Sequence, residues 1–464
     1  MNLTNIVHNL PYTVKQPFKY IYSVLPEQWR LGKTFRDTYN FLQESQWRSK
    51  KELENYQMQQ LSKLLHHAYE NVPYYQKIFN ERGLTPKDIQ NFDDFKKLPY
   101  LTKEIIRDNL HDLTARNYPK STLEYVTTGG STGIPLGFYY EKGVSMVKEW
   151  AFMLAQWNRA GFKIGDKRVI LRGIVENSHK FWRYNPLQKT LTLSSGHMTD
   201  ETMPAYINKI YKFHPAFLHV YPSAITILAK FMKSNNIKPF PSIKAVLCGS
   251  ENIYPWQREL LKEVFQCRIY SWYGQTEMCV LAGECEHSNS YHVFPEYGFV
   301  ELLKNDGAPL TDEGELGEII GTGFINYALP FIRYKTMDLA VYTNTSCTCG
   351  RAYPLLKGIE GRLHEFIVTP KNRLISMTAI NMHSDVFDNV KQFMFYQDTR
   401  EKVVLNIIKK ATYTERDTEY IKRELYKKLG EDITLEVRFV EHIPPTKSGK
   451  ARFLEQKLKI DGCD

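Results

Sequence analysis

Long hydrophobic runs are missing from this sequence of 464 residues. No stretch approaches the ~18 apolar residues that a membrane-spanning helix needs. The first residues are polar, and no basic segment followed by an apolar core marks a secretory signal. The sequence also contains no internal repeat and no low-complexity tract. These absences argue against a membrane-spanning, secreted or repeat protein, and the length predicts two or more globular domains with a sizeable core.

Cysteine is scarce, and neither charge nor hydrophobicity is extreme. The seven cysteines are an odd number spread over a long chain, so we expect reduced thiols and a cytoplasmic protein. Hydrophobic residues make up 42% and charged residues 24%, as in ordinary globular proteins. The 61 basic and 51 acidic residues give a net charge of +10, but the charges are scattered. A nucleic-acid partner is therefore not expected.

The most distinctive stretch is 125–135, where three glycines and four Ser or Thr hydroxyls lie between two hydrophobic segments. Glycine adopts positive φ and lets backbone N–H groups close around an anion, while hydroxyls add further donors. Such a loop suits nucleotide phosphates. It is not a Walker A loop, because no Gly-Lys-Ser/Thr follows, and it lacks the G-x-G-x-x-G spacing of a dinucleotide fingerprint. Alone it would more often be a solvated turn, so its interpretation depends on the motifs that follow.

The residues before this loop, 1 to about 115, are predicted to be helical. Apolar residues recur at helical spacing, and Pro73 ends that segment. The residues that carry this periodicity are Leu61, Leu64, Leu65 and Ala68. The aromatic and basic run at 15–22 is expected to pack on the domain, with contact to a membrane surface as the alternative.

After the loop, short apolar segments at 169–171, 217–220 and 245–248 predict buried parallel strands, with a crossover helix at 225–232. A turn-rich β region follows, in which Gly314, Gly317, Gly321 and Gly323 punctuate residues 318–320. The pattern changes after 358–362. Strands at 403–407 and 433–440 and an amphipathic helix at 415–428 then predict a small α+β domain of about a hundred residues.

Four further stretches carry chemically useful side chains: 248–251, 272–277, 333–338 and 444–450. The stretch 248–251 lies at the end of a predicted strand, and 272–277 follows a predicted strand at 268–270. Open α/β sheets bind ligands beyond the carboxyl ends of their strands. Tyr offers a flat face for a purine, Thr a hydroxyl for a phosphate, Glu an oxygen for Mg²⁺, and Asp338 an acceptor for both ribose hydroxyls. Each residue alone is more often structural or merely solvated. The ordered set indicates a nucleotide site.

This set resembles the motifs of the adenylate-forming superfamily of acyl-CoA synthetases, peptide-synthetase adenylation domains and luciferases. Within it, the likeness is greatest to the phenylacetate–CoA ligase group and its relatives in capsular-polysaccharide gene clusters. The stretches typical of that group are 65–75, 98–103, 347–351 and 361–362. The likeness runs from about residue 50 to the end of the sequence. It implies an α/β fold with a large, multi-subdomain N-terminal domain over 1–363 and a small, mobile α+β domain over 364–464.

The resemblance also implies a two-step reaction. A carboxylate attacks the α-phosphate of ATP to give acyl-AMP and pyrophosphate, and a thiol or an amine then takes the acyl group. Catalysis of this kind is mostly positioning and charge neutralisation. The roles that the resemblance implies are carried over to matching positions. The phosphates would be bound by Thr128, Gly129, Gly130, Ser131, Thr132 and Gly133, with Thr276 at the α-phosphate and Glu277 as the Mg²⁺ ligand. The adenine would be lined by Gly249, Ser250 and Glu251 and stacked on by Tyr273 beside Gly274, and the ribose would be bound by Asp338 and Arg362.

Lys450 is the implied catalytic cation, which would bridge the substrate carboxylate and the α-phosphate, with Lys447 as the alternative. A compact ammonium suits a point of developing charge. Because Lys450 falls in the small domain, that domain must close over the large one, with a hinge after Arg362 near His364. Three positions depart from the family pattern. Leu136 stands in place of Lys, Met337 in place of Gly, and His364 in place of a hinge acid. The departure at His364 bears mainly on the second half-reaction.

Cys347 and Cys349 form a C-x-C pair, and Cys285 and His292 lie upstream in a stretch that can fold back. Three thiolates and an imidazole would make a closed structural zinc site, with His287 as a competing ligand. The alternative is four ordinary reduced residues, because C-x-C is tighter than the usual C-x₂-C. The other cysteines, Cys248, Cys267 and Cys279, are interpreted as core residues.

The sequence therefore predicts an ATP- and Mg²⁺-dependent carboxylate ligase with CoA as the acyl acceptor. The alternatives are an amine acceptor in surface-polysaccharide synthesis and a non-catalytic basic binding protein. The wall of the acid pocket is expected at 221–223 and 250–253, which flank the nucleotide motifs. The identity of the acid and the oligomeric state are not readable from the residues.

Overall fold

The computed structural model describes residues 31–128, 136–173, 181–304, 306–362, 366–371, 374–380, 386–387, 389–444 and 452–458. Several predictions fall outside these ranges: the run at 15–22, Gly129, Gly130, Ser131, Thr132 and Gly133 of the glycine loop, His364, Lys447 and Lys450. None of the helices in the described part of the chain is long and apolar enough to cross a membrane.

The described part of the lead-in, residues 31–122, is helical, as the sequence predicts. It consists of α4 (Gly32–Ser45), α5 (Lys50–Asn71), α6 (Pro73–Glu81), η1 (Pro86–Asp88), α7 (Phe92–Phe95), α8 (Lys103–Asp108), α9 (Leu110–Leu113) and η2 (Lys120–Thr122). A capping box starts α5, because the backbone N–H of Glu52 donates to the Ser49 hydroxyl and that of Ser49 to the Glu52 carboxylate. The leucines and alanine at helical spacing form the buried face of α5. This helix ends before Pro73, which begins α6 at a position where its missing N–H costs nothing.

A hairpin and a helix connect this lead-in to the main sheet. Strands β1 (Leu123–Thr127) and β2 (Gly137–Glu141) pair antiparallel, and the glycine loop connects them in the sequence. The helix α10 (Ser145–Asn158) follows and packs along α4.

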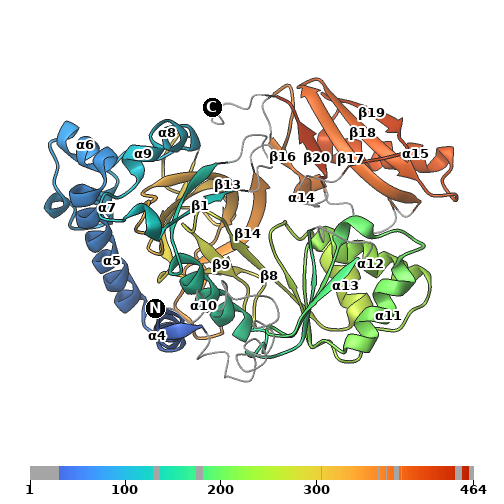
Figure 1. The fold of residues 1–464 in the computed structure, drawn as a ribbon. Coiled ribbons are helices and arrows are strands. Elements are labelled where there is room, and N and C mark those ends of the chain that lie inside the picture. Colours follow the sequence, from blue (N-terminus) through green and yellow to red (C-terminus); the bar gives the residue numbers. More distant parts are fainter. Residues whose placement is uncertain are drawn as a thin grey trace.

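Twelve strands form one mixed sheet (Figure 1). Their order across the sheet is β11 (Gly298–Leu303), β12 (Leu316–Gly323), β13 (Tyr334–Tyr342), β14 (Leu355–Arg362), β10 (Tyr291–Val293), β9 (Leu281–Gly283), β8 (Arg268–Gly274), β7 (Ala245–Cys248), β6 (Phe217–Val220), β3 (Arg168–Leu171), β5 (Thr190–Leu193) and β4 (Trp182–Asn185). The run β8-β7-β6-β3-β5 is parallel, and all other pairs are antiparallel. The three predicted parallel strands are thus confirmed as β3, β6 and β7.

The parallel strands are covered on both faces, which explains their continuous apolar sequences. Helices α11 (Met203–Phe213), α12 (Pro222–Ser234) and α13 (Pro255–Phe265) pack against one face through residues such as Leu218 and Val246. The other face, with Phe217 and Leu247, packs against α10 and α4. The predicted crossover helix is α12, which is longer than its apolar segment. The short η3 (Ser195–His197) lies before α11.

Two predictions about this sheet were wrong. The segment 272–274 lies inside β8 and not after it, because β8 pairs parallel with β7 up to Ser271 and then antiparallel with β9. Gly317, Gly321 and Gly323 lie inside β12 and not in turns. Space is the reason: a Cβ on Gly321 would lie 2.7 Å from the Cβ of Cys279, because the chain at 278–280 crosses close to this strand.

The C-terminal part has its own sheets and core. Strands β15 (Phe366–Val368) and β16 (Leu374–Ser376) form a pair, followed by α14 (Met377–Ile380). A four-stranded sheet has the order β19 (Thr434–Phe439), β18 (Lys402–Lys409), β17 (Val390–Thr399) and β20 (Leu454–Gln456), with α15 (Glu415–Leu429) packed against it. The predicted strands and helix of a small α+β unit are confirmed. The boundary at 363/364 stays a prediction.

One aromatic contact joins this unit to the larger part of the chain. Tyr254, at the start of α13, is 8% exposed and belongs to the apolar cluster of the C-terminal sheet. Its ring lies edge-on to Phe453, with 5.3 Å between ring centroids.

Candidate functional site

The predicted nucleotide motifs lie at one edge of the sheet. Val220, Cys248 and Ser271 are register partners at the carboxyl ends of β6, β7 and β8. The residues that follow them therefore meet at the edge where open α/β sheets bind ligands. Glycine is required at 249, because a Cβ there would lie 2.3 Å from the indole of Trp272.

The segments predicted to wall the acid pocket meet at this edge. The carboxylate of Glu251 accepts from the backbone N–H of Ser223 at 2.9 Å and from its hydroxyl at 3.0 Å. Ser223 lies in the first turn of α12, so the carboxylate also compensates unsatisfied N–H groups at the positive end of that helix. The role of Glu251 at the adenine stays a prediction.

A cation lies beside these segments. The guanidinium of Arg172 donates to Nε2 of His219 at 2.8 Å and to the Ser250 hydroxyl at 3.3 Å. Its Cζ lies 5.0 Å from the centroid of the Tyr221 ring. Burial lowers the pKa of His219 well below its ordinary value, and the two nearby arginines lower it further, so its Nε2 is available as an acceptor.

Tyr273 and Asp338, which are 65 positions apart, meet in the fold. The Tyr273 hydroxyl donates to Oδ2 of Asp338 at 2.6 Å, and it lies 3.3 Å from the side-chain oxygen of Gln275. Burial, and then the charge of Asp338, raise the pKa of Tyr273 well above its usual value, so the hydroxyl keeps its proton and acts as a donor. Asp338 is also the cross-strand partner of Arg362. The two residues expected at the ribose are thus neighbours on β13 and β14.

Glu277 is held by a residue that sequence analysis did not select. Its side chain is 8% exposed, and Oε1 accepts from the Tyr334 hydroxyl at 2.9 Å. Burial and the charge of Glu277 raise the pKa of Tyr334 well above its ordinary value, so this hydroxyl also remains a donor. An ionised carboxylate has further lone pairs beyond the one that Tyr334 occupies, so Glu277 fits as an oxygen ligand of Mg²⁺.

The hairpin that carries the glycine loop is fastened to the same segment. The backbone N–H of Thr128 donates to the carbonyl of Leu136 at 2.9 Å, and that of Leu136 to the Thr128 hydroxyl at 3.0 Å. These bonds close the base of the loop. On β2, the Tyr140 hydroxyl donates to the backbone carbonyl of Thr276. The described ends of the loop are therefore tied to the stretch with Tyr273, Gly274 and Glu277.

Two of the three departures from the family pattern have structural consequences. Leu136 is fully buried, so its side chain belongs to the core. Met337 adopts φ +64°, a left-handed conformation that glycine accepts and an ordinary side chain disfavours. Its backbone N–H donates to Oε1 of Glu318 at 3.1 Å, which helps to hold it there.

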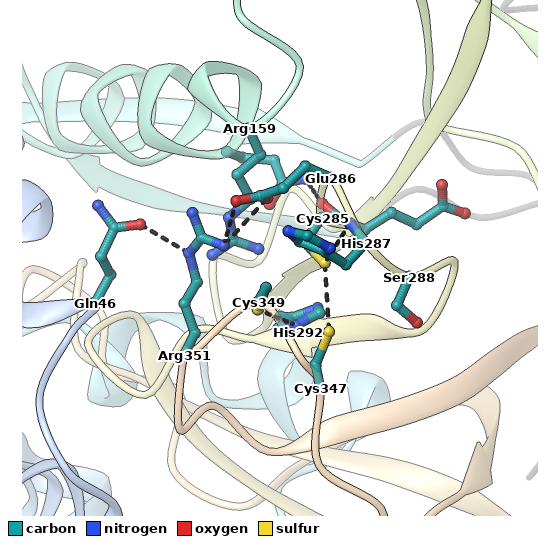
Figure 2. A network of polar contacts seen from close by, with 12 residues as sticks. Gln46, Arg159, Cys285, Glu286, His287, Ser288, His292, Cys347, Cys349 and Arg351 are labelled. Atoms are coloured by element: carbon teal, nitrogen blue, oxygen red, sulfur yellow. Dashed lines mark hydrogen bonds and ion pairs between the residues drawn. The ribbon is translucent and has the colours of Figure 1, made fainter.

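The four predicted metal ligands also converge (Figure 2). The Sγ atoms of Cys285 and Cys347 are 3.6 Å apart, and Sγ of Cys349 lies 3.3 Å from Nε2 of His292. All four candidate ligand atoms lie within 4.8 Å of one another, and His287 is not among them. His287 contacts the cluster through its backbone N–H, which donates to Sγ of Cys285. Of the presumed core cysteines, Cys248 and Cys279 are fully buried, whereas Cys267 is only partly buried.

The residues that orient the selected ones were not predicted from the sequence: Tyr334, Tyr140, Arg172 and His219. Tyr334 lies within the stretch 333–338, which was singled out from the sequence, but only the fold brings this side chain to Glu277. A signal for Arg172 and His219 was present, since polar residues at the ends of predicted buried strands lie at the ligand-binding edge.

Comparisons with known proteins agree with this arrangement. The model of the AMP-binding enzyme family matches residues 69–323, which is more than half of the chain. The model of the CapK C-terminal domain matches residues 367–457. Among curated relatives, Protein CapK of Staphylococcus aureus is 26% identical over 423 residues, covering 87% of this chain and 89% of its own. The phenylacetate-coenzyme A ligase of Escherichia coli is 29% identical over 331 residues, covering 68% and 72%.

A solved structure shares the fold. The 2-hydroxyisobutyryl-CoA ligase in its postadenylation state has a TM-score of 0.70 at 17% identity, with 88% of this chain and 90% of the ligase covered. The resemblance inferred from the motifs and the predicted fold class are both confirmed. The chain belongs to the AMP-binding enzyme family and is an adenylate-forming ligase.

Proposed function

We propose that this protein activates a small carboxylic acid with ATP and passes the acyl group to CoA. The observation that carries the proposal is the hydrogen bond between Tyr273 and Asp338 at the carboxyl edge of the sheet. It joins two motifs that are distant in sequence and whose expected roles are adjacent, one at the adenine and one at the ribose.

The described residues have distinct tasks in this proposal. Tyr273 stacks on the adenine and orients Asp338, which accepts from the ribose hydroxyls. Arg362 donates to the ribose oxygens. Tyr334 orients Glu277, which would hold the Mg²⁺ that neutralises phosphate charge. The main chain of 249–251 lines the adenine. Thr276 and the loop 128–133 donate to the phosphates. The Tyr140 hydroxyl of the hairpin holds the backbone carbonyl of Thr276, and the backbone N–H of Leu136 holds the hydroxyl of Thr128.

Lys450 supplies the cation between two anions. As the acid oxygen attacks the α-phosphate, the bond to pyrophosphate breaks and negative charge gathers where a carboxylate and a phosphate already repel each other. A lysine ammonium neutralises this charge without needing a planar partner. The acyl-AMP then reacts with the thiol of CoA, releasing AMP and forming a thioester.

Exchange of labelled pyrophosphate into ATP, in the presence of single acids from a panel, tests the first half-reaction. One acid class should support exchange, and Lys450→Ala should reduce it by about two to three orders of magnitude, as expected when a group that stabilises transition-state charge is removed. Lys447→Ala is the matched control, because the same charge is lost three residues away on the same segment. If no acid of the panel supports exchange, or if both variants lose exchange activity equally, the proposal is contradicted.

An amine is the alternative acceptor, because the C-terminal part of the chain matches the CapK domain. With the active acid in hand, CoA and a panel of amino sugars and amino acids are offered in parallel. A thioester detected by mass spectrometry supports the CoA proposal. Consumption of ATP that depends on an amine, with an amide as product, would replace CoA by that amine.

A further inference from the structure

We propose that Cys285, His292, Cys347 and Cys349 bind one structural Zn²⁺ that fastens the β13–β14 loop to strands β9 and β10. This site lies outside the nucleotide motifs and does not depend on the acyl acceptor. Ligand geometry, the orientation of the histidine and the charge around the cluster each support it independently.

Two of the distances between the candidate ligand atoms fit tetrahedral zinc. With Zn–S near 2.3 Å and Zn–N near 2.0–2.1 Å, tetrahedral angles place ligand atoms about 3.4–3.8 Å apart. The S···S distance of 3.6 Å between Cys285 and Cys347 and the S···N distance of 3.3 Å between Cys349 and His292 lie in or next to that range. Three sulfurs and one imidazole nitrogen in this arrangement favour zinc over Mg²⁺ or Ca²⁺, which prefer oxygen.

The sheet holds these side chains in place. His292 is the register partner of Gly283 on β9 and of Leu355 on β14. Cys285 follows β9 by two residues, and the other two cysteines lie in the loop that leads into β14. Ligands on paired strands keep their positions better than ligands on an isolated loop. All four protein positions are supplied by side chains, which is typical of a structural site and leaves no open position for a reaction.

His292 is oriented for binding through Nε2. Its Nδ1 lies 3.2 Å from the carbonyl oxygen of Ser290, an atom that can only accept, so Nδ1 carries the proton. The lone pair is then on Nε2, which faces Cys349. A ligating histidine commonly donates its other ring N–H to a carbonyl or a carboxylate in this way.

The surroundings are arranged for a negative centre. Three thiolates, a neutral imidazole and Zn²⁺ together carry a charge of −1. Arg351 lies at this cluster, held by Gln46 at 2.9 Å and by the carboxylate of Glu286 at 3.0 and 3.1 Å (Figure 2). A second cation beside the cluster would add to the balance of the metal centre's negative charge.

Arg159 is that second cation. It is 6% exposed, its Nη1 donates to the carbonyl of Gly283 at 3.3 Å, and its guanidinium lies 4.5 Å from the centre of the Phe294 ring. Within the described residues, its Nε and Nη2 have no hydrogen-bond partner. Gly283 is the register partner of His292, so this guanidinium lies beside the cluster. A buried cation with unpaired N–H groups is costly, and an anionic metal centre beside it would provide counter-charge.

Metal analysis of the full-length protein, purified without chelator or added metal, tests the proposal. We expect about one zinc per chain, because binding to a closed site of this type is strong. Cys349→Ser should retain less than about a tenth of that zinc, since it removes one of only four ligands. Cys267→Ser is the matched control, because this partly buried cysteine lies outside the cluster, and its zinc content should equal that of the parent.

Two measurements on the parent protein do not depend on whether a variant folds. Replacement of zinc by Co²⁺ should produce the thiolate-to-cobalt charge-transfer absorption of a tetrahedral sulfur site, and thiol titration should find three cysteines that react only after chelation. Parent protein without metal, in which Cys285, Cys347 and Cys349 titrate without chelation, overturns the proposal, as does a Cys285–Cys347 disulfide found by peptide mapping. Failure of pyrophosphate exchange in protein that contains zinc would refute only the proposed function.

Discussion

Replacing Tyr273 with Phe removes one hydroxyl and leaves the aromatic face in place. This hydroxyl donates to Asp338, which is 8% exposed, at 2.6 Å. The ring would still stack on adenine, whereas the carboxylate proposed to bind ribose would lose the donor that orients it. The substitution therefore separates the positioning of Asp338 from stacking.

The size of the effect follows from the type of hydrogen bond. A buried hydrogen bond to a charged group contributes about 1.5–3 kcal/mol. Since ~1.4 kcal/mol corresponds to a tenfold change, kcat/KM for ATP should fall by about tenfold to about a hundredfold. The KM for the acid should change much less, because the loss concerns nucleotide binding.

The assay is pyrophosphate exchange at varied ATP and saturating acid. Tyr270→Phe is the matched control: it removes a hydroxyl from the same strand, and this hydroxyl donates to the carbonyl of Arg159, outside the nucleotide motifs. The control should exchange like the parent. If kcat/KM for ATP in Tyr273→Phe stays within about twofold of the control, well below the factor expected for a charge-assisted bond, Asp338 does not bind ribose as proposed.

Two predictions concern stability. Arg333 forms a two-pronged ion pair with Glu301, at 2.8 and 3.0 Å, and both side chains are buried. Arg333→Met should cost about 3–5 kcal/mol in urea denaturation, because it leaves a buried carboxylate unpaired. Lys304→Met removes a partly exposed ion pair with Glu315 and should cost far less. A similar loss in both variants would contradict this reasoning. Glu149 is partly exposed as a residue, but its carboxyl group is buried, and burial raises its pKa to about 7 despite a hydrogen bond from Tyr297. The folded state then binds the proton more tightly, so the free energy of unfolding should fall by up to about 3 kcal/mol as the pH rises from about 4.5 to about 7. Glu149→Gln should flatten this pH dependence in a series of denaturation curves. An unchanged pH dependence would refute the raised pKa of Glu149.

Much of the fold follows from local sequence. The apolar spacing of α5, the buried strands at 217–220 and 245–248, and the amphipathic helix at 415–428 all appear in the structure close to their predicted positions. Each signal is local, because burial of one helix face or of a whole short strand leaves a periodic pattern in the chain. The nucleotide motifs were also recognisable, since their residue types and order suit phosphate, ribose and purine.

Predictions failed where a partner came from a distant segment. Residues 272–274 extend β8 because β9 pairs with them. Gly321 and Gly323 lie in β12, where the segment 278–280 crosses too close for a side chain. Neither partner can be read from the neighbouring sequence, because strand pairing and close packing depend on the tertiary fold.

The sequence by itself determined the class of chemistry and the candidate ligands, including three cysteines and two competing histidines. The tertiary structure decided how they are arranged. It turned His292 rather than His287 towards the three sulfurs and set Tyr273 against Asp338 and Tyr334 against Glu277. It also buried Arg159 beside the cluster, with no hydrogen-bond partner for its Nε and Nη2 among the described residues. The physical reason is that residue types set which bonds can form, whereas strand pairing and burial set which atoms come within reach.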